Sequence, residues 1–227
     1  ANRIGLVCRC MLLDDGQRLV LIDTGIGDKW TALERDRFAI QRDDGIPGAL
    51  RRIGRDPADV TDVIQTHLHF DHAGGLTRFA GDDSVVPTYP NATLRVQQTN
   101  WDWAQAPTPR DAGSYREMDW RPYAEGEAPL ERLHGSGPVL PGIEVIATRG
   151  HTPGHQAVRV QGLTEPDVVF CGDIFPTRSH LRLPWTMGYD LSPLDILEEK
   201  RALLEESHER GTWLWLEHDP SNALAQV

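Results

Sequence analysis

The chain has 227 residues, of which 39% are hydrophobic, and this size and composition predict one globular domain over residues 1–227. Its formal net charge of -11 disfavours a broad basic surface for nucleic acid or anionic lipid, so we expect a small, neutral substrate. No run approaches the roughly 20 apolar residues of a membrane span, and the N-terminus lacks a secretory pattern. Three cysteines in such a chain favour reduced thiols and a cytoplasmic location.

Two apolar runs, Leu6 to Leu13 and Leu19 to Ile22, flank turn-forming residues and predict a β-hairpin. Cys8 and Cys10 would point the same way on its first strand. A thiolate metal site is one interpretation, but core packing is favoured because free cysteine is among the most buried residue types. Asp23 ends the second strand, where it is either a turn residue or the acceptor that orients a metal-bound histidine.

Short helices are expected within 29–40 and 48–53, before a strand over 60–66. That strand leads into a dense group of potential metal ligands, His67, His69, Asp71 and His72. On an extended segment alternate side chains share a face, so the first three can converge, and a turn adds the fourth. A histidine-rich surface loop would explain one or two of these residues, but not four at this spacing.

Gly74 and Gly75 follow the group and are expected to give the backbone freedom for a sharp exit. The region 76–140 is then rich in proline and glycine, with a strand predicted at 93–96 and a helix around 98–104. It contains five clustered aromatic residues: Trp101, Trp103, Tyr115, Trp120 and Tyr123. Any one of them is expected to cover the core, but we expect at least one to contact substrate.

Three further predicted strands, 143–148, 168–171 and 213–216, each end at potential ligands. The first leads to His151 and His155 in a Gly/Pro-shaped loop, where one histidine is expected to bind metal and the other to support it. Asp173 follows the second strand and His218 the third. Repeated ligands at strand ends indicate one shared site at a sheet edge.

A helix is predicted from Pro193 to about Arg210, with Ser192 as N-cap, Gly211 as stop and an apolar stripe that includes Leu194. The three remaining histidines carry no partner signature and are expected to be exposed: His134, His180 and His208.

Taken together, the Thr66–Gly75 stretch, the Gly-His-Thr-Pro-Gly-His loop, Gly172-Asp173 and the late His218 resemble the metallo-β-lactamase fold superfamily, in the expected order. The resemblance runs from Asp23 to His218. It implies an α/β (α+β) architecture: an αββα sandwich of two mixed β-sheets flanked by helices. Relatives carry a further strand at each end, so we expect a domain trimmed at both ends.

The resemblance implies two divalent metal ions, zinc by default, with iron or manganese as alternatives. His67, His69 and His151 would hold the first ion, Asp71, His72 and His218 the second, and Asp173 would bridge them. Asp23 and His155 would support the ligands. A bridging hydroxide would be the nucleophile, and Asp71 would pass a proton to the leaving group.

The ligand set is similar to those of acyl-homoserine lactonases, glyoxalase II and organophosphate hydrolases. Lactonases of this kind usually have a tyrosine three residues after the bridging Asp, but Pro176 stands there and Tyr189 is the candidate replacement. The other residues expected at the substrate are Trp101, Phe175, Trp185 and Met187. We therefore expect a dinuclear hydrolase for a small lactone, ester or related compound.

Several alternatives stay open. The same site could serve a phosphotriesterase or a weak β-lactamase, and the ligand set also supports a di-iron oxidoreductase. A binding or regulatory protein with low turnover is a further alternative. Beyond a small-molecule substrate, no nucleic acid or membrane partner is expected, and a homodimer is left open.

Overall fold

The computed structural model describes residues 4–41, 44–81, 84–162 and 165–227. The chain forms two compact units that interleave along the sequence. The His67 unit consists of Cys10–Val96 and Ala104–Glu131, and the Asp173 unit of Ala1–Arg9, Gln97–Trp103 and Arg132–Val227. The single domain expected over 1–227 stays a prediction, and the trimming expected at Ala1 lies outside the described residues.

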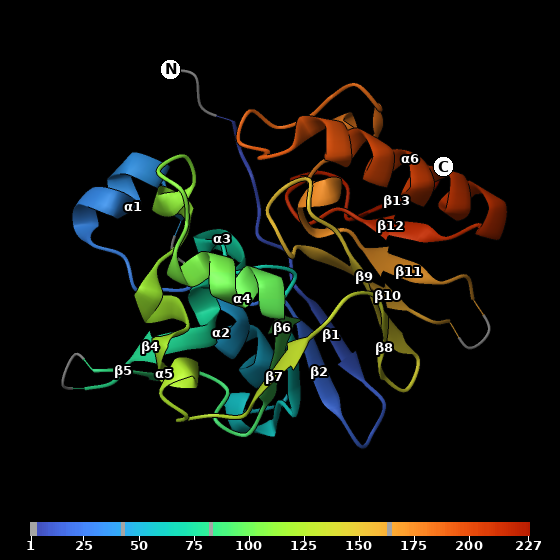
Figure 1. The fold of residues 1–227 in the computed structure, drawn as a ribbon. Coiled ribbons are helices and arrows are strands. Elements are labelled where there is room, and N and C mark those ends of the chain that lie inside the picture. Colours follow the sequence, from blue (N-terminus) through green and yellow to red (C-terminus); the bar gives the residue numbers. More distant parts are fainter. Residues whose placement is uncertain (1–3, 42–43, 82–83, 163–164) are drawn as a thin grey trace. The chain divides into compact units, whose positions relative to one another are not determined.

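A five-stranded mixed sheet organises the His67 unit (Figure 1). The predicted hairpin is present, with β1 (Met11–Asp14) antiparallel to β2 (Leu19–Ile22). β3 (Asp62–Ile64) and β6 (Thr93–Gln97) continue the sheet in parallel, and β7 (Leu130–Leu133) is its last strand. Every residue of β2 and β3 is buried, as expected for central parallel strands.

Short elements complete the His67 unit. Thr31 and Glu34 form a capping box at the start of its first helix, because each side chain accepts a backbone N–H that the helix leaves unpaired. The α-helices and the small two-stranded sheet are α1 (Ala32–Phe38), α2 (Gly45–Arg52), α3 (Phe70–Ala73), α5 (Arg121–Ala124), β4 (Thr77–Phe79) and β5 (Val85–Pro87). Its 3-10 turns are Pro57–Asp59, Gly74–Leu76, Ala112–Ser114 and Glu117–Asp119.

A second mixed sheet, of six strands, organises the Asp173 unit. Its strands in sheet order are β13 (Leu224–Ala225), β12 (Trp213–Trp215), β11 (Val168–Phe170), β10 (Gln156–Val160), β9 (Ile143–Ala147) and β8 (Gly137–Leu140). β11 and β12 are parallel, whereas β9, β10 and β11 pair antiparallel. The carboxyl ends of β9, β11 and β12 therefore share one edge of the sheet.

Two α-helices and two 3-10 turns complete this unit: α4 (Gln98–Gln105), α6 (Pro193–Arg210), Gly172–Ile174 and Arg178–Leu181. The long helix α6 packs on the sheet, since Leu203 lies in one core cluster with Val169 and Leu214 (Figure 1). Its predicted bounds are confirmed. Gly211 ends it with φ of 69°, in the left-handed region that glycine adopts without strain.

Several local expectations were wrong. The first hairpin strand begins at Met11, so Cys8 and Cys10 precede it. Ser192 is the N-cap residue of α6 as predicted, but its hydroxyl donates to Asp195 Oδ2 at 2.6 Å and accepts no backbone N–H of the helix. Leu194 is 76% exposed and lies outside the apolar stripe of α6.

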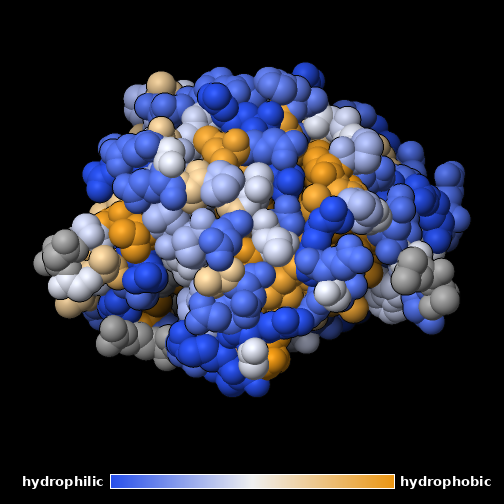
Figure 2. All heavy atoms as spheres, turned by 90° about the horizontal axis from the view of Figure 1, so that it is seen from below, coloured by the Kyte–Doolittle hydropathy of each residue, from blue (hydrophilic) through white to orange (hydrophobic). Residues whose placement is uncertain are grey.

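On the face shown in Figure 2, hydrophilic side chains predominate and hydrophobic ones appear in small separate patches. Within the described ranges, no helix combines the length and apolarity that crossing a bilayer requires.

Candidate metal-binding clusters

The His67 unit gathers its potential ligands where β3 runs out into α3. His67, His69 and His72 are all buried, and their rings converge. The His67 centroid lies 4.4 Å from that of His69 and 4.0 Å from that of His72. The expectation of an extended segment through Asp71 was wrong, because helix α3 begins at Phe70. Asp71 and His72 therefore share a helical turn, with Asp71 Oδ1 3.9 Å from His72 Nε2.

Asp23 fixes this cluster from beneath. It is fully buried after β2, accepts the Thr66 backbone N–H on Oδ1 at 2.7 Å and the Thr66 hydroxyl on Oδ2 at 2.7 Å. His72 Nδ1 lies 2.9 Å from Asp23 Oδ2. A carboxylate can only accept, so Nδ1 carries the proton and Nε2 keeps its lone pair for a metal. In this position Asp23 adopts a left-handed φ of 55°, a strained conformation that is unusual for a residue other than glycine.

The two glycines after α3 serve close approach rather than backbone freedom. Gly74 has an ordinary negative φ of -59°, which any residue can adopt. A Cβ on Gly74 would stand 2.2 Å from the Ile26 carbonyl oxygen, and one on Gly75 would stand 2.2 Å from that of Thr24. Any side chain at either position would push the turn that carries Asp71 and His72 away from the segment after β2.

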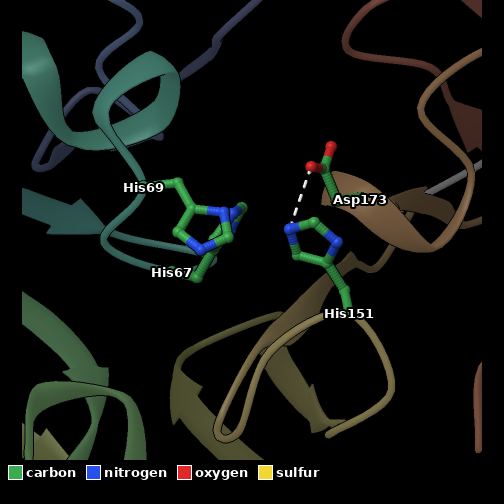
Figure 3. Close-up of side chains that lie close together, drawn as sticks. All are labelled: His67, His69, His151 and Asp173. Atoms are coloured by element: carbon green, nitrogen blue, oxygen red, sulfur yellow. Dashed lines mark ion pairs between the residues drawn. The ribbon is translucent and has the colours of Figure 1, made fainter. Parts of the chain in front are cut away.

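In the Asp173 unit, two histidines face the two oxygens of one carboxylate. His151 Nε2 lies 3.1 Å from Asp173 Oδ2, as Figure 3 shows, and His218 Nε2 lies 3.1 Å from Asp173 Oδ1. All three side chains are buried. They come from the β9–β10 loop, the turn after β11 and the end of β12, which the strand order brings to one sheet edge.

The other ring nitrogen of each of these histidines also faces an acceptor. His151 Nδ1 lies 2.9 Å from Asp190 Oδ1, and His218 Nδ1 lies 2.7 Å from the Val7 carbonyl oxygen. A neutral imidazole has one N–H and cannot donate on both sides. With that N–H on Nδ1, the Nε2 atom that faces Asp173 keeps its lone pair for a metal ion.

The pKa of His218 is consistent with the position of its ring beside the Asp173 carboxylate. Burial alone lowers the pKa of this imidazole, but the nearby Asp173 carboxylate, together with Cys8 and Glu217, outweighs burial and raises the pKa well above its ordinary value. The Asp173 pair of oxygens is thus a strong site for positive charge.

His155 plays a different part in the same loop. Its Nε2 accepts the Asp173 backbone N–H at 3.1 Å, and its Nδ1 lies 2.7 Å from the Thr148 hydroxyl. Because the Nε2 lone pair is engaged by the backbone of Asp173, His155 positions that residue and does not offer the lone pair to a metal.

The residues expected at the substrate divide into two groups. Trp101, Phe175 and Met187 are buried, and Phe175 belongs to the core cluster of the Asp173 unit. Trp185 and Tyr189 are 49% and 58% exposed, and the substrate contact expected of all five residues stays a prediction. The Tyr189 ring centroid lies 6.2 Å from that of His151.

Two residues beside the ligands had no assigned role from sequence. Asp190 holds His151, but an isolated carboxylate in a loop 39 residues away gives no spacing signal. Tyr115 was one of five clustered aromatics, and its ring packs edge-on against His69 at 4.7 Å. It also lines a cavity of about 550 Å³ in the His67 unit, with Trp120, Arg121, Glu117 and Gln105 among the other walls.

Among the remaining histidines, His134 and His208 are exposed, as expected. His180 is half-buried instead, with its Nδ1 2.8 Å from the Thr177 hydroxyl. Burial lowers the pKa of His180.

The donors of both clusters suit a divalent transition metal. Each cluster combines imidazole nitrogen with carboxylate oxygen, the ligands that zinc, iron and manganese accept. The Nδ1 atoms of His72 and His151 face carboxylates, which orients Nε2 as the metal ligand. The buried His and Asp residues therefore fit metal ions.

Most of the chain also matches a known family. The model of the metallo-beta-lactamase superfamily matches residues 3–213, and the chain belongs to this superfamily. The fold expected from the resemblance, with mixed sheets flanked by helices, is confirmed.

Its relatives are named as hydrolases. A probable metallo-hydrolase of Mycobacterium tuberculosis is 29% identical over 96% of this chain and 73% of its own length. An N-acyl homoserine lactonase of Bacillus cereus is 28% identical over 70% of this chain and 60% of its own length. The crystal structure of a probable metal-dependent hydrolase from Staphylococcus aureus superposes with a TM-score of 0.91 at 28% identity, covering 99% of this chain and 79% of that one. The prediction that the chain is a metal-dependent hydrolase is confirmed.

Proposed function

We propose that the chain is a dinuclear metallohydrolase that opens a small neutral lactone or ester. The two clusters would act as halves of one centre, in which His67, His69 and His151 hold one ion. Asp71, His72 and His218 would hold the other, and Asp173 would bridge the two. Membership of the superfamily supports joining the halves in this way.

The observation that carries the proposal is the Asp173 carboxylate with a histidine on each oxygen. Both histidines have their second nitrogen committed to another acceptor. Their Nε2 atoms lie at equal distances of 3.1 Å from different oxygens, so the carboxylate is set for two cations, one on each side. A single structural metal would not require this symmetry.

Two divalent ions in such a centre supply a strong oxygen nucleophile at neutral pH and polarise the substrate carbonyl. The protein's own groups do the remaining work. The Asp71 side chain is 29% exposed at the end of its cluster, where it can hold a proton for the leaving oxygen. Asp23, Asp190 and His155 keep the ligands in fixed orientations, so little reorganisation is needed during the reaction.

Tyr189 is the group we assign to the substrate carbonyl. Pro176 occupies the position where the lactonase pattern has its tyrosine, so a hydroxyl must come from elsewhere. Tyr189 is 58% exposed and its ring lies 6.2 Å from that of His151, so the side chain stands beside a predicted ligand.

The cavity beside Tyr115 is suited to the acyl part of the substrate. Its volume of about 550 Å³ falls within the range of small-molecule sites. Apolar walls from Ala104, Pro107 and Trp120 would pack against a short chain, while Gln105 and Arg121 could donate to an amide or ester oxygen.

Metal analysis and a substrate panel test the proposal. Purified protein loaded with zinc, manganese or iron in turn should bind two equivalents and hydrolyse lactones faster than aryl esters, phosphotriesters or a cephalosporin. Tyr189→Phe should lower kcat for the lactone by about tenfold while keeping both metals, because it removes one hydrogen bond to the reacting carbonyl. No turnover of any compound at full metal occupancy would refute a hydrolase, and redox-active iron without hydrolysis would favour an oxidoreductase.

A further inference from the structure

The sequence has 23 lysines and arginines, but only Lys29 and Lys200 are lysines. Both are buried, with 2% and 0% of their surface exposed. Lysine is among the residue types least often buried. In this chain all the other residues counted with lysine as basic are arginines. Placing the only two lysines inside the protein indicates a task that needs a compact ammonium group.

Lys200 lies on the buried face of α6, beside Ile196 and Leu203. Its ammonium donates to three backbone carbonyls of one loop, those of Arg182 at 2.8 Å, Leu183 at 3.1 Å and Trp185 at 2.7 Å. An ammonium has three N–H donors, so the three carbonyls match its full capacity. Within the described chain, its hydrogen-bond partners are these three loop carbonyls.

The same loop reaches the His151 segment at its other end. Asp190 holds His151 Nδ1 and also accepts the Met187 N–H at 2.8 Å. The backbone N–H groups of Leu191 and Ser192 donate to the carbonyls of His151 and Gly150 at 3.1 and 2.8 Å. Tyr189 lies between these attachments, so the position of its ring depends on both ends of the loop.

Lys200 also touches the segment that follows Asp173. Its Nζ lies 5.6 Å from the centroid of the Phe175 ring, within the range of a cation–π contact. The charged and titratable groups that act on it are Asp190, on the loop, and His180, on the turn before the loop. Burial lowers the pKa of Lys200 to about 8, so the ammonium is held at an energetic cost that its three carbonyl bonds offset.

We propose that Lys200 is a positioning residue for the reaction: its ammonium fixes the 182–190 loop and thereby sets Tyr189 and Asp190 against His151. This role rests on the proposed function, because it assigns the loop to the substrate side of the centre. Lysine suits it better than arginine, since three carbonyls that converge on one point are met by a single nitrogen.

Three variants of the full chain test this role, each with metal loaded. Lys200→Met keeps the aliphatic stem and removes all donors. Lys200→Gln keeps an amide that can still donate to the loop, which guards against simple misfolding of the first variant. Arg201→Met is the matched control, because Arg201 is the next residue of α6 and its ion-pair partner among the described residues is the exposed Glu198.

Hydrogen–deuterium exchange gives a readout that needs no turnover. Lys200→Met should retain both metals, but its Met187, Asp190 and Leu191 amides should exchange at least tenfold faster than in wild type. Exchange of these amides in Lys200→Gln should lie between Lys200→Met and wild type. Exchange in Arg201→Met should equal that of wild type. In lactone hydrolysis, KM should rise and kcat/KM should fall about tenfold, as expected for misplaced substrate-contacting groups.

The outcomes separate this proposal from the proposed function. Wild-type exchange of the loop amides in Lys200→Met would overturn the positioning role even if lactones are hydrolysed. If the loop amides of Lys200→Met exchanged faster but neither wild type nor any variant hydrolysed a lactone, the result would support Lys200 as the residue that fixes the loop. It would refute the proposed hydrolase function. If amides throughout the protein exchanged faster, and to the same extent in Lys200→Met and Lys200→Gln, Lys200 would have a general structural role. This result would also overturn the proposal.

Discussion

The two clusters are built in different ways. In the His67 unit, the donors lie within one stretch from His67 to His72, so a strand exit and one helical turn bring them together. In the Asp173 unit, His151, Asp173 and His218 come from three strand ends and meet only because β9, β11 and β12 end at the same sheet edge. Local sequence thus specifies the first cluster, whereas sheet pairing specifies the second.

The largest expected effect separates the clusters directly. Asp173→Ala removes the carboxylate on which His151 and His218 converge, so it should lower kcat/KM by at least about 1,000-fold and release one metal or both. Steady-state kinetics and metal analysis of the same sample measure this. Normal rate with two metals bound would show that the bridging assignment is wrong.

Gly74→Ala tests the close approach on which the His67 cluster depends. Its Cβ would stand 2.2 Å from a backbone oxygen that cannot rotate away, so the variant should lose about 3 kcal/mol in free energy of unfolding. Urea denaturation measures it. Gly113→Ala is the control, since a Cβ there meets nothing within 4 Å, and equal stability of the two variants would contradict the expectation.

Asp190→Asn compares the carboxylate that orients His151 with the one that orients His72. It should lower metal affinity or kcat/KM by about 10- to 100-fold, the usual cost of losing such a partner. Asp23→Asn should cost more, because Asp23 also accepts two hydrogen bonds from Thr66. Metal titration of both variants measures the order, and a reversed order would mean that the Thr66 bonds contribute little.

The smallest effect concerns Asp219, next to His218. Although burial raises the pKa of this carboxyl, backbone N–H groups of Arg178, Ser221 and Asn222 outweigh it and lower the pKa to about 2. A lowered carboxyl pKa stabilises the fold above the unfolded-state pKa of about 4, and this is lost as pH falls towards 2. Between pH 5 and 3, metal-free wild type should lose about 1 kcal/mol more than Asp219→Asn. Urea titrations at the two pH values measure the difference, and parallel losses would contradict it.

The same contrast explains what could be predicted. The spacing of His67 and His69 located one cluster, and the end residues of the predicted strands located Asp173 and His218. The helical turn at Asp71 was missed because four residues carry too little periodicity to reveal a helix. The roles of Asp190 and Tyr115 were missed because each contacts its histidine only through tertiary structure.

The distribution of aromatic residues was harder to interpret. Clustering in a loop-rich region does not distinguish a side chain that packs the core from one that lines a cavity. Trp101 and Tyr123 are buried, whereas Tyr115 is half-buried against a predicted ligand. Burial of single aromatics depends on long-range packing, which local sequence does not determine.

The scarcity of lysine gives the protein a built-in pair of unfolding reporters. A lysine-specific protease can cleave this chain only after Lys29 and after Lys200, one bond in each unit, and both side chains are buried in the native state. Cleavage therefore requires local or global opening, and its rate follows the open population when reclosing is fast. Fragment sizes would report which unit opened first, with no label and no engineered site.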